Sequence, residues 1–432
     1  MYAMELQNED GRRKRRRISP PNQNPELSEE IIVEEILVRL PVKSLVRFKS
    51  VCKAWRATIS DPIFIRAHLR HSATKQEQDP CVIISPLIMD NVIPGESRPS
   101  TFSNQFRFYQ WHHLQANGGS TPSSKQTATH IYTKDLGSGE VIRQMGYFAF
   151  CDGLVLVRTD TKLYLLNPAT RDSLTLPDNK RNKLGREFCN SAGLGLDPRS
   201  GKYKVVRAFY RSLDITTNAY GMGMEVFTVG AGRRRAWRKI AHDVPYPVCR
   251  QQSSLSVKGL MFWRIDKVRH GHHQTPPRGL LHLNLADESF GVTRLPDSMD
   301  PALDDTFFMD MLHGELWLTA CTSRTPDTLT IWAMPVDDNG GQGQWEQRYS
   351  IVGYPLIFRP LALLPGSGDG SSQVLFWNRL RLYSYDLATS MLTIECELDR
   401  MRYQGRKARK WKNLCKFTAR LYTESLVPLT AY

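Results

Sequence analysis

The sequence contains no long hydrophobic run. No uninterrupted apolar stretch in its 432 residues approaches the roughly 18 residues that a membrane helix requires. Charged residues stand near the N-terminus, where a secretory signal would carry an apolar stretch. Hydrophobic residues make up 41% and charged residues 23%, proportions typical of globular proteins. We therefore expect a soluble protein that is neither inserted in a membrane nor secreted.

The sequence also lacks paired cysteines and glycosylation signals. Its 8 cysteines are scattered singly, without the C-x-x-C spacing of zinc sites and thiol-exchange centres. No Asn is followed two residues later by Ser or Thr, so no N-glycosylation signal is present. These absences favour reduced thiols and an intracellular protein.

No catalytic motif is recognisable in the sequence. It has no Gly-x-Ser-x-Gly, and the glycine-rich stretch 366–372 lacks the Gly-Lys-Ser/Thr ending of a P-loop. One histidine cluster, His270, His272 and His273, lies among Gly, Gln and Pro residues, which is typical of a solvated loop, with a metal site as the alternative. We expect a protein that is not an enzyme and that has no metal and no cofactor.

Positive charge exceeds negative charge, with 58 Lys and Arg, 43 Asp and Glu, and a formal net charge of +15. Residues 12–17 and 402–416 account for most of the excess. The first run lies in a polar segment, residues 1–25, that we expect to be a disordered basic arm. It is a candidate nuclear import signal, with a solvated tail as the alternative, and we expect the protein in the nucleus and the cytoplasm. The run consists of Arg12, Arg13, Lys14, Arg15, Arg16 and Arg17.

Residues 26–69 show helical periodicity. Apolar residues recur at spacings of three and four from Ile32 to Leu40, behind Ser28, a suitable helix N-cap. Pro41 interrupts the pattern, a second apolar set runs over residues 45–59, and a third, short set follows Pro62. We therefore predict a compact unit of three helices. Because so small a unit cannot bury all of its apolar surface, we expect it to dock on a partner.

The same residues resemble a known family. The segment LPVKSLVRFKSVCKAWR, residues 40–56, together with residues 59–62 and Phe64, is similar to the core of the F-box. The resemblance implies docking on a Skp-type adaptor, which joins the F-box to a cullin scaffold with a RING subunit. For Val51 and Trp55, a place in the unit's own core is the alternative. The positions expected to contact the adaptor are Ile36, Leu40, Pro41, Val42, Leu45, Val46, Val51, Cys52 and Trp55.

Residues 80–430 contain short apolar runs between turn residues, which is typical of β-strands. One unit recurs: a Gly before an apolar strand, a second apolar strand with aromatics, and a polar turn. It is clearest in residues 152–177 and 258–296, and further copies begin near residues 193, 313 and 374. The period of about 50 to 60 residues is that of kelch-type blades. We predict an all-β kelch-like propeller with about five visible blades, closed by residues 81–111 and 421–426.

This region also resembles a known domain. Residues 167–171, 195–206 and 422–426 are similar to segments of the F-box-associated domain of plant F-box proteins. Together, the two resemblances imply a substrate-recognition subunit of an SCF-type ubiquitin ligase. The F-box would bind the adaptor, and the propeller would bind an unknown protein substrate to promote its ubiquitination and proteasomal degradation. The ubiquitin chemistry would reside in other subunits.

The substrate is expected to bind loops on one face of the propeller, because propeller ligands often contact loops carried by a rigid scaffold. Candidate loops are residues 178–187, 264–278 and 402–416. The last loop interleaves aromatic and basic residues, which fits an anionic partner or a charged insertion between strands. Its candidate substrate- or anion-binding residues are Arg406, Lys407, Arg409, Lys410 and Trp411.

Two other functions stay open at this point: a nuclear propeller protein that binds nucleic acid or chromatin through its basic segments, and a kelch-type propeller enzyme. A nucleic-acid binder would lose most of its affinity between low and moderate salt. An enzyme would bring ligand clusters or acid–base pairs to the propeller axis. We expect neither nucleic acid nor a membrane as a partner, since a basic loop this short makes few phosphate contacts.

Overall fold

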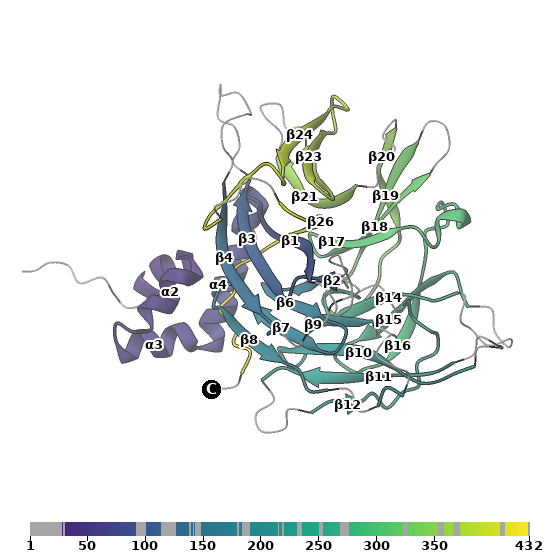
Figure 1. Ribbon diagram of the computed structural model, residues 1–432, viewed down its shortest axis with the longest axis horizontal. Coiled ribbons are helices and arrows are strands. Elements are labelled where there is room, and N and C mark those ends of the chain that lie inside the picture. Colours follow the sequence, from purple (N-terminus) through teal and green to yellow (C-terminus); the bar gives the residue numbers. More distant parts are fainter. Residues whose placement is uncertain are drawn as a thin grey trace, which may run out of the picture.

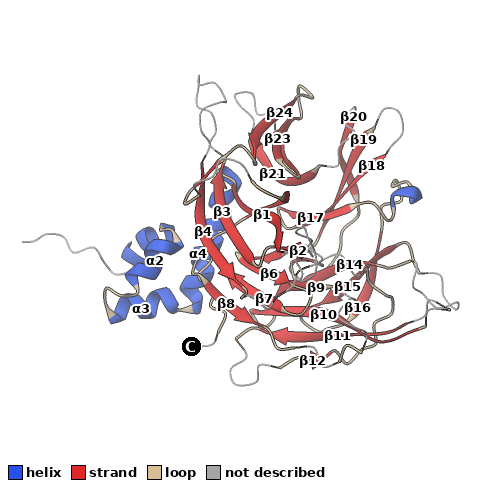
Figure 2. Cartoon of the chain, in the orientation of Figure 1, coloured by secondary structure: helices blue, strands red, loops and turns tan. Residues whose placement is uncertain are grey.

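The computed structural model describes residues 28, 31–91, 101–113, 127–137, 140, 142, 148–178, 181–183, 191–214, 216–217, 220–230, 236–249, 254–267, 276–322, 327–352, 358–365, 372–406 and 411–430. A group of helices lies beside a set of β-sheets (Figures 1 and 2). The expected basic arm and the three clustered histidines lie outside the described residues.

The N-terminal region has four helical segments, not the three that the periodicity predicted. The first is irregular and consists of a π-helical stretch and a 3-10 turn. None of the described helices is long and apolar enough to cross a membrane. The segments are η1 (Ile32–Ile36) with η2 (Leu37–Arg39), α2 (Val42–Phe48), α3 (Lys53–Ser60) and α4 (Pro62–Gln78).

The additional segment arises because the helix expected over residues 45–59 is broken between α2 and α3. Cys52 is extended, with φ −152° and ψ 168°, and its Sγ accepts a hydrogen bond from the Trp55 N–H at 3.4 Å, which caps α3. The Ser50 hydroxyl donates to the Arg47 carbonyl at 2.7 Å and so competes with the helical bonds of the backbone. The apolar spacing continues across the break, so the periodicity alone could not reveal it.

Two prolines set the other helix boundaries. Leu40 is extended, with ψ 146°, because a residue before proline avoids the helical region, and Pro41 then precedes α2. Asp61 caps α4, with its carboxylate accepting from the Ile63 N–H at 2.6 Å and Pro62 in the first turn. Beyond residue 69, α4 continues to Gln78, farther than the short helix expected, through residues of high helix propensity.

The β region is a six-bladed propeller, and its first blade combines the two ends of the chain. Four strands form this blade, and two short strands lie at its margins. They are β26 (Leu414–Leu421), β1 (Cys81–Asn91), β3 (Gln105–His112) and β4 (Thr127–Asp135), with β2 (Thr101–Phe102) and β25 (Arg402–Tyr403) beside them.

The other five blades are four-stranded antiparallel sheets that follow the chain in order. The short helix η3 (Pro301–Leu303) lies between the fourth and fifth blades. The second and third blades contain β5 (Ala149–Cys151), β6 (Leu154–Arg158), β7 (Leu163–Asn167) and β8 (Asp172–Thr175), then β9 (Ala192–Asp197), β10 (Lys202–Leu213), β11 (Tyr220–Thr228) and β12 (Arg238–Lys239). The fourth contains β13 (Leu255–Val257), β14 (Leu260–Arg264), β15 (Gly279–Asn284) and β16 (Phe290–Arg294). The last two contain β17 (Phe308–Leu312), β18 (Glu315–Thr322), β19 (Thr328–Pro335) and β20 (Glu346–Val352), then β21 (Arg359–Pro365), β22 (Ser372–Asn378), β23 (Arg381–Asp386) and β24 (Leu392–Glu397).

Strand β26 closes the ring. It pairs antiparallel with β1, with Val82 opposite Leu421 and Ile84 opposite Ala419. The closing strand therefore covers residues 414–421, earlier than the 421–426 predicted. Residues 422–429, hereafter the C-terminal segment, continue beyond the blade. Consequently the two ends of the basic region 402–416 belong to β25 and β26.

The recurring glycine of the sequence repeat belongs to one hairpin turn in three blades. The pairs Asp152–Gly153, Lys258–Gly259 and His313–Gly314 all have positive φ and join the first strand of a blade to the second. Two consecutive positive φ values are typical of the type I′ turn, whose twist suits a two-residue hairpin. The repeat in the sequence thus marks the innermost hairpin of each of these blades.

Asn167, at the end of β7, holds the C-terminal segment. Its buried side chain donates from Nδ2 to the carbonyls of Ser425 at 2.9 Å and Val427 at 3.0 Å. Its Oδ1 accepts from the backbone N–H groups of Ala169 and Thr170. One amide side chain therefore fixes both a turn and a segment about 260 residues away in the chain.

The C-terminal segment attaches the helices to the propeller. A carboxylate oxygen of Glu424 accepts from the Val42 N–H at 2.9 Å, at the start of α2, and Thr423 bonds to Gln76 of α4. One hydrophobic cluster contains side chains from the helices, from the second and third blades and from this segment. Its members include Leu37, Val42, Leu45, Ile59, Phe64, Ile65, Leu154, Leu194, Leu426 and Leu429. The helical unit and the propeller therefore share a core.

The close packing of the C-terminal segment on the Gly153 turn can be tested with two glycines. A Cβ at Gly153 would lie 2.3 Å from the Thr423 carbonyl oxygen, whereas one at Gly201 would meet nothing within 4 Å, and both have positive φ. We expect Gly201→Ala to cost about 1 to 2 kcal/mol for the left-handed backbone. Gly153→Ala should cost about 1 to 3 kcal/mol more because of overpacking. Urea unfolding measures both losses, and equal losses would contradict this packing.

The pH dependence of stability should report on His68 of α4. Its Nε2 lies 2.9 Å from the Leu40 carbonyl oxygen, and burial lowers its pKa below the ordinary 6.5. Below about pH 6.5 the unfolded chain therefore takes up a proton that the folded imidazole does not, so the free energy of unfolding falls with falling pH. Burial also lowers the pKa of His130 and His282, so these two residues contribute to the same decrease of the free energy of unfolding with falling pH.

The His68→Gln variant isolates the contribution of this one histidine. We expect its free energy of unfolding to fall less steeply than that of the wild type between about pH 7 and pH 5. Urea unfolding across this range measures both slopes under the same conditions. Identical slopes would show that His68 does not remain neutral in the folded protein.

Candidate functional site

The nine residues expected to contact an adaptor differ widely in exposure. Val42 and Leu45 are fully buried in the core that the helices share with the propeller. Leu40 and Trp55 are half-buried, and the Trp55 ring packs on that of Phe48 with centroids 5.2 Å apart. These four side chains thus support the helical unit from within, in whole or in part.

The other five expected residues, Ile36, Pro41, Val46, Val51 and Cys52, are exposed. Val51 is 61% exposed, so it does not take the place in the unit's own core that the sequence left open. Exposed apolar side chains are a common feature of docking surfaces. The helical unit therefore exposes several of the apolar side chains that were expected to contact a partner.

Two further exposed side chains on this unit, Ile31 and Ile63, were not expected from the sequence. Ile63 is 71% exposed and lies in the first turn of α4, where nothing in the spacing distinguishes it from a core residue. Ten large hydrophobic side chains are exposed in the described part of the chain, and half of them lie between residues 31 and 63. They are Ile31, Ile36, Val46, Val51 and Ile63.

The part of this unit formed by α2 and α3 is positively charged. Residues 42–60 contain five basic residues and no acidic one. Four of the five, Lys43, Arg47, Lys53 and Arg56, are exposed. A partner that covers this surface would match it best with apolar side chains and acidic residues around them.

A basic groove lies on the first blade, beside the loop between β25 and β26. Arg406 stacks on the Trp411 ring, with its Cζ 3.3 Å from the ring centroid, and burial lowers the pKa of its guanidinium. Arg107, Lys412 and Asp90 also line this groove, which encloses about 330 Å³. Two of the five expected anion-binding residues therefore meet here. The other three, Lys407, Arg409 and Lys410, lie outside the described residues.

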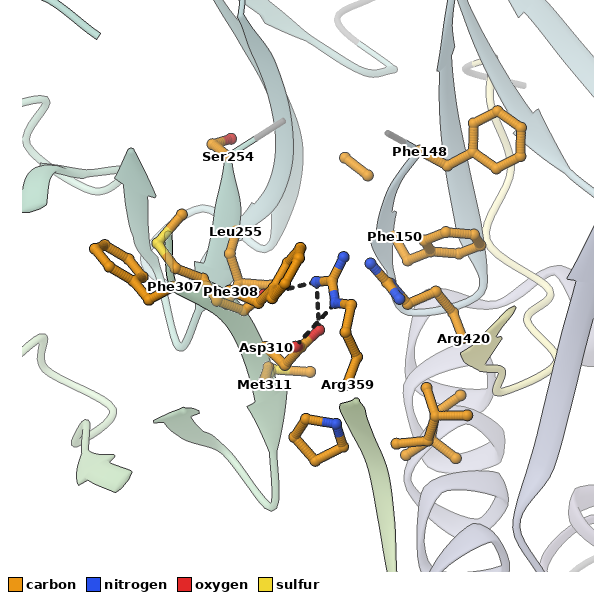
Figure 3. Close-up of a pocket in the computed structure, with 15 residues that line it drawn as sticks. Phe148, Phe150, Ser254, Leu255, Phe307, Phe308, Asp310, Met311, Arg359 and Arg420 are labelled. Carbon is orange, nitrogen blue, oxygen red and sulfur yellow. Dashed lines mark hydrogen bonds and ion pairs between the residues drawn. The ribbon is translucent and has the colours of Figure 1, made fainter. Parts of the chain in front are cut away.

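A second cavity, of about 140 Å³, lies inside the propeller (Figure 3). Its walls come from β5, β13, β17, β21 and β26, which are the innermost strands of five blades. No local motif could have revealed it, because the lining residues extend from Phe148 to Leu421. Among the described residues, no group of three or more His, Cys, Asp and Glu side chains is arranged to hold a metal ion.

Comparison with known proteins assigns the helical part and the β part of the chain to two known domain families. Residues 25–67 match the family model of the F-box domain, and residues 101–356 match that of the F-box associated beta propeller domain. The second match alone covers 256 of the 432 residues.

Among solved structures, an oligogalacturonate lyase from Vibrio parahaemolyticus has a TM-score of 0.37 at 10% identity, and the match covers 73% of this chain and 79% of that chain.

Curated relatives come from Arabidopsis thaliana. The putative F-box protein At4g38870 is 24% identical over 338 residues, which cover 77% of this chain and 70% of that protein. F-box protein At5g10340 is 25% identical over 337 residues, which cover 75% of this chain and 69% of that protein. Because the propeller family model covers more than half of the chain and the F-box model matches its N-terminal region, this chain belongs to the plant F-box proteins that have an F-box-associated β-propeller domain.

Proposed function

We propose that this protein is the substrate-recognition subunit of an SCF-type ubiquitin ligase. Its F-box binds a Skp-type adaptor and, through it, a cullin-RING scaffold, and its propeller binds a protein target for ubiquitination and degradation. The observation that carries the proposal is an F-box domain with an exposed apolar surface, fused to a propeller that belongs to the F-box-associated family.

The chemistry of the F-box surface supports this assignment. Its exposed aliphatic side chains provide the apolar contact of a docking site, and the basic residues of α2 and α3 provide complementarity to an acidic partner. Val42 and Leu45 act indirectly, because their burial fixes α2 on the propeller. We therefore assign the adaptor contact to Ile36, Pro41, Val46, Val51 and Cys52, with Leu40 and Trp55 at its margin.

The shared core supports a role in positioning. A ligase that holds two proteins together raises the effective concentration of the target near the ubiquitin-carrying enzyme, provided that the geometry permits transfer. The bond from Val42 to Glu424 and the cluster around Leu426 join the F-box directly to the propeller. In this proposal the protein is not itself an enzyme and serves as a rigid connector.

Several finer predictions belong to the same proposal. The basic groove at Arg406 and Trp411 is a candidate contact for an anionic part of the target. The blades are of kelch type, the F-box and propeller domains span residues 26–69 and 80–430, and the basic run 12–17 directs import into the nucleus.

Adaptor binding tests the proposal directly. We expect the wild-type protein to bind a purified Skp-type adaptor, and Val51→Glu to weaken binding by tenfold or more, since the change places a charge in an apolar contact, at a cost of about 1.4 kcal/mol or more. Biolayer interferometry measures the affinity. Val51 is 61% exposed, so the variant should unfold at the same urea concentration as the wild type.

A valine on the propeller provides the matched control. Val352, in β20, is 55% exposed, and Val352→Glu should leave adaptor binding unchanged. Failure of the folded wild type to bind the adaptor would overturn the ligase proposal. Equal binding by the Val51 variant would instead move the adaptor contact away from this surface.

A further inference from the structure

The propeller has two faces, and the C-terminal segment packs on one of them. The first strands of all blades run in the same direction along the axis of a propeller, so the turns that follow them lie on one face. This face, hereafter the F-box face, carries the turns at Gly153, Gly259 and Gly314. The C-terminal segment packs against Gly153 there.

Helix α4 crosses the F-box face. Near its start, Phe64 and Ile65 belong to the hydrophobic cluster that includes the second and third blades. Near its end, Glu77 Oε1 lies 4.0 Å from Nδ1 of His313, in the first turn of the fifth blade, and the helix also lies against β21 of the sixth blade. The F-box face is therefore occupied by the protein's own helix and C-terminal segment, which leaves the opposite face for another partner.

The opposite face, hereafter the far face, carries parts of all three loops that we expected to bind a substrate. Because neighbouring strands are antiparallel, each second strand ends on the far face and each third strand begins there. Asn182 Oδ1 accepts from the Tyr210 N–H at 3.0 Å, near the end of β10. Arg278 directly precedes β15, and the Asn413 carbonyl accepts from the Met89 N–H at 2.9 Å, near the end of β1. These three loops thus meet on the face turned away from the F-box.

The basic groove of the first blade also lies on the far face. The far ends of β1 and β3 line it, together with the residues that precede β26. Residues 402–416, which border it, contain seven basic residues and no acidic one. Of the seven residues that line the groove, three are cationic, Arg107, Arg406 and Lys412, and one is acidic, Asp90. A cleft dominated by one sign of charge attracts a partner of the opposite sign.

Lys412 is the exposed member of the three cations. Within the described chain, no ion pair and no side-chain hydrogen bond involves Lys412, and Asp90 pairs with none of the three cations. Arg107, in contrast, donates to Gln105 Oε1 at 2.8 Å. Lys412 therefore offers a positive charge that the neighbouring side chains of the described chain do not neutralise.

The contacts of Trp411 favour a polypeptide over a nucleic acid. Among the seven described residues that line the groove, Trp411 is the only aromatic one. Arg406 covers its ring, and the rings of Tyr403 and Phe417 pack against it with centroids 5.1 and 5.5 Å away. Single-stranded nucleic acids, however, stack successive bases on exposed aromatic rings. The groove encloses about 330 Å³, which suits a short segment of a partner.

We propose that the far face binds an acidic polypeptide segment of the target protein, with its carboxylates in the basic groove at Lys412 and Arg107. The proposal rests on the ligase assignment, since it names the class of target that the propeller recruits. Because the groove and the helices lie on opposite faces, one molecule binds the target and the adaptor without competition between them.

Capped, fluorescently labelled hexaglutamate is the first probe, and capped hexaglutamine is the neutral comparison. The measurement uses the full-length chain with all six basic residues of 12–17 replaced by Gln, because that run also attracts acidic peptides. We expect hexaglutamate to bind at least about tenfold more tightly than hexaglutamine at low salt, since only the first forms charge-assisted bonds. Fluorescence anisotropy measures both affinities, and saturating adaptor should leave them unchanged.

Two charge reversals in this background locate the site. Lys412→Glu should weaken hexaglutamate binding about tenfold or more, because it replaces an attractive charge with a repulsive one. Lys202→Glu makes the same change at an exposed lysine at the start of β10, on the F-box face, and should leave the affinity unchanged. Thermal melting confirms that both variants are folded.

The proposal is overturned if hexaglutamate does not bind at millimolar concentration, or if the two reversals have equal effects. It is also overturned if the adaptor competes with the peptide, or if an oligothymidylate binds more tightly than hexaglutamate and loses affinity in Lys412→Glu, which would make the groove a nucleic-acid site. Loss of adaptor binding alone would overturn the ligase assignment, whereas peptide binding that depends on Lys412 would still support the acidic-peptide site.

Discussion

The antiparallel pairing of β26 with β1 is the interaction on which the rest of the structure depends. It joins the last strand of the propeller to the first, so that one blade holds both ends of the ring together. Because β26 is innermost in its blade, it also carries Arg420 and Leu421 into the central cavity. The cavity therefore exists only when the two ends of the propeller are paired.

The same strand controls the attachment of the F-box. Where β26 ends at Leu421, the C-terminal segment begins. Its Glu424 binds the start of α2, and the carbonyls of the residues that follow are bound by Asn167 of the second blade. Ring closure and F-box docking are thus consecutive parts of one stretch of chain. A loss of pairing at β26 would open the ring and weaken this attachment, while the helices also pack directly on the second and third blades, which couples the stability of the adaptor-binding unit to that of the propeller.

The sequence predicted most of the architecture because its signals were local. The five visible repeats correspond to five blades, and in three of them the recurring glycine lies in a two-residue hairpin turn that requires positive φ. Pro41 and Asp61 mark helix boundaries through backbone restriction and capping, which also act over a few residues. The errors arose where a local pattern was compatible with two structures. The apolar period continues through the break between α2 and α3, and the basic run before β26 concealed the closing strand.

The sequence by itself determined whether each region is helical or β-stranded, and it determined the two domain types. The reason is that periodicity, turn residues and the F-box motif are all patterns among residues that are close together in the chain. Tertiary structure decided which apolar side chains are buried and which are offered to a partner. Val42 and Val46 lie four residues apart in one helix, yet the propeller covers the first and leaves the second exposed. Tertiary structure alone also brought Asp310, Arg359 and Arg420 together from three blades. Closure of the ring places residues side by side that are far apart in the chain and share no sequence spacing.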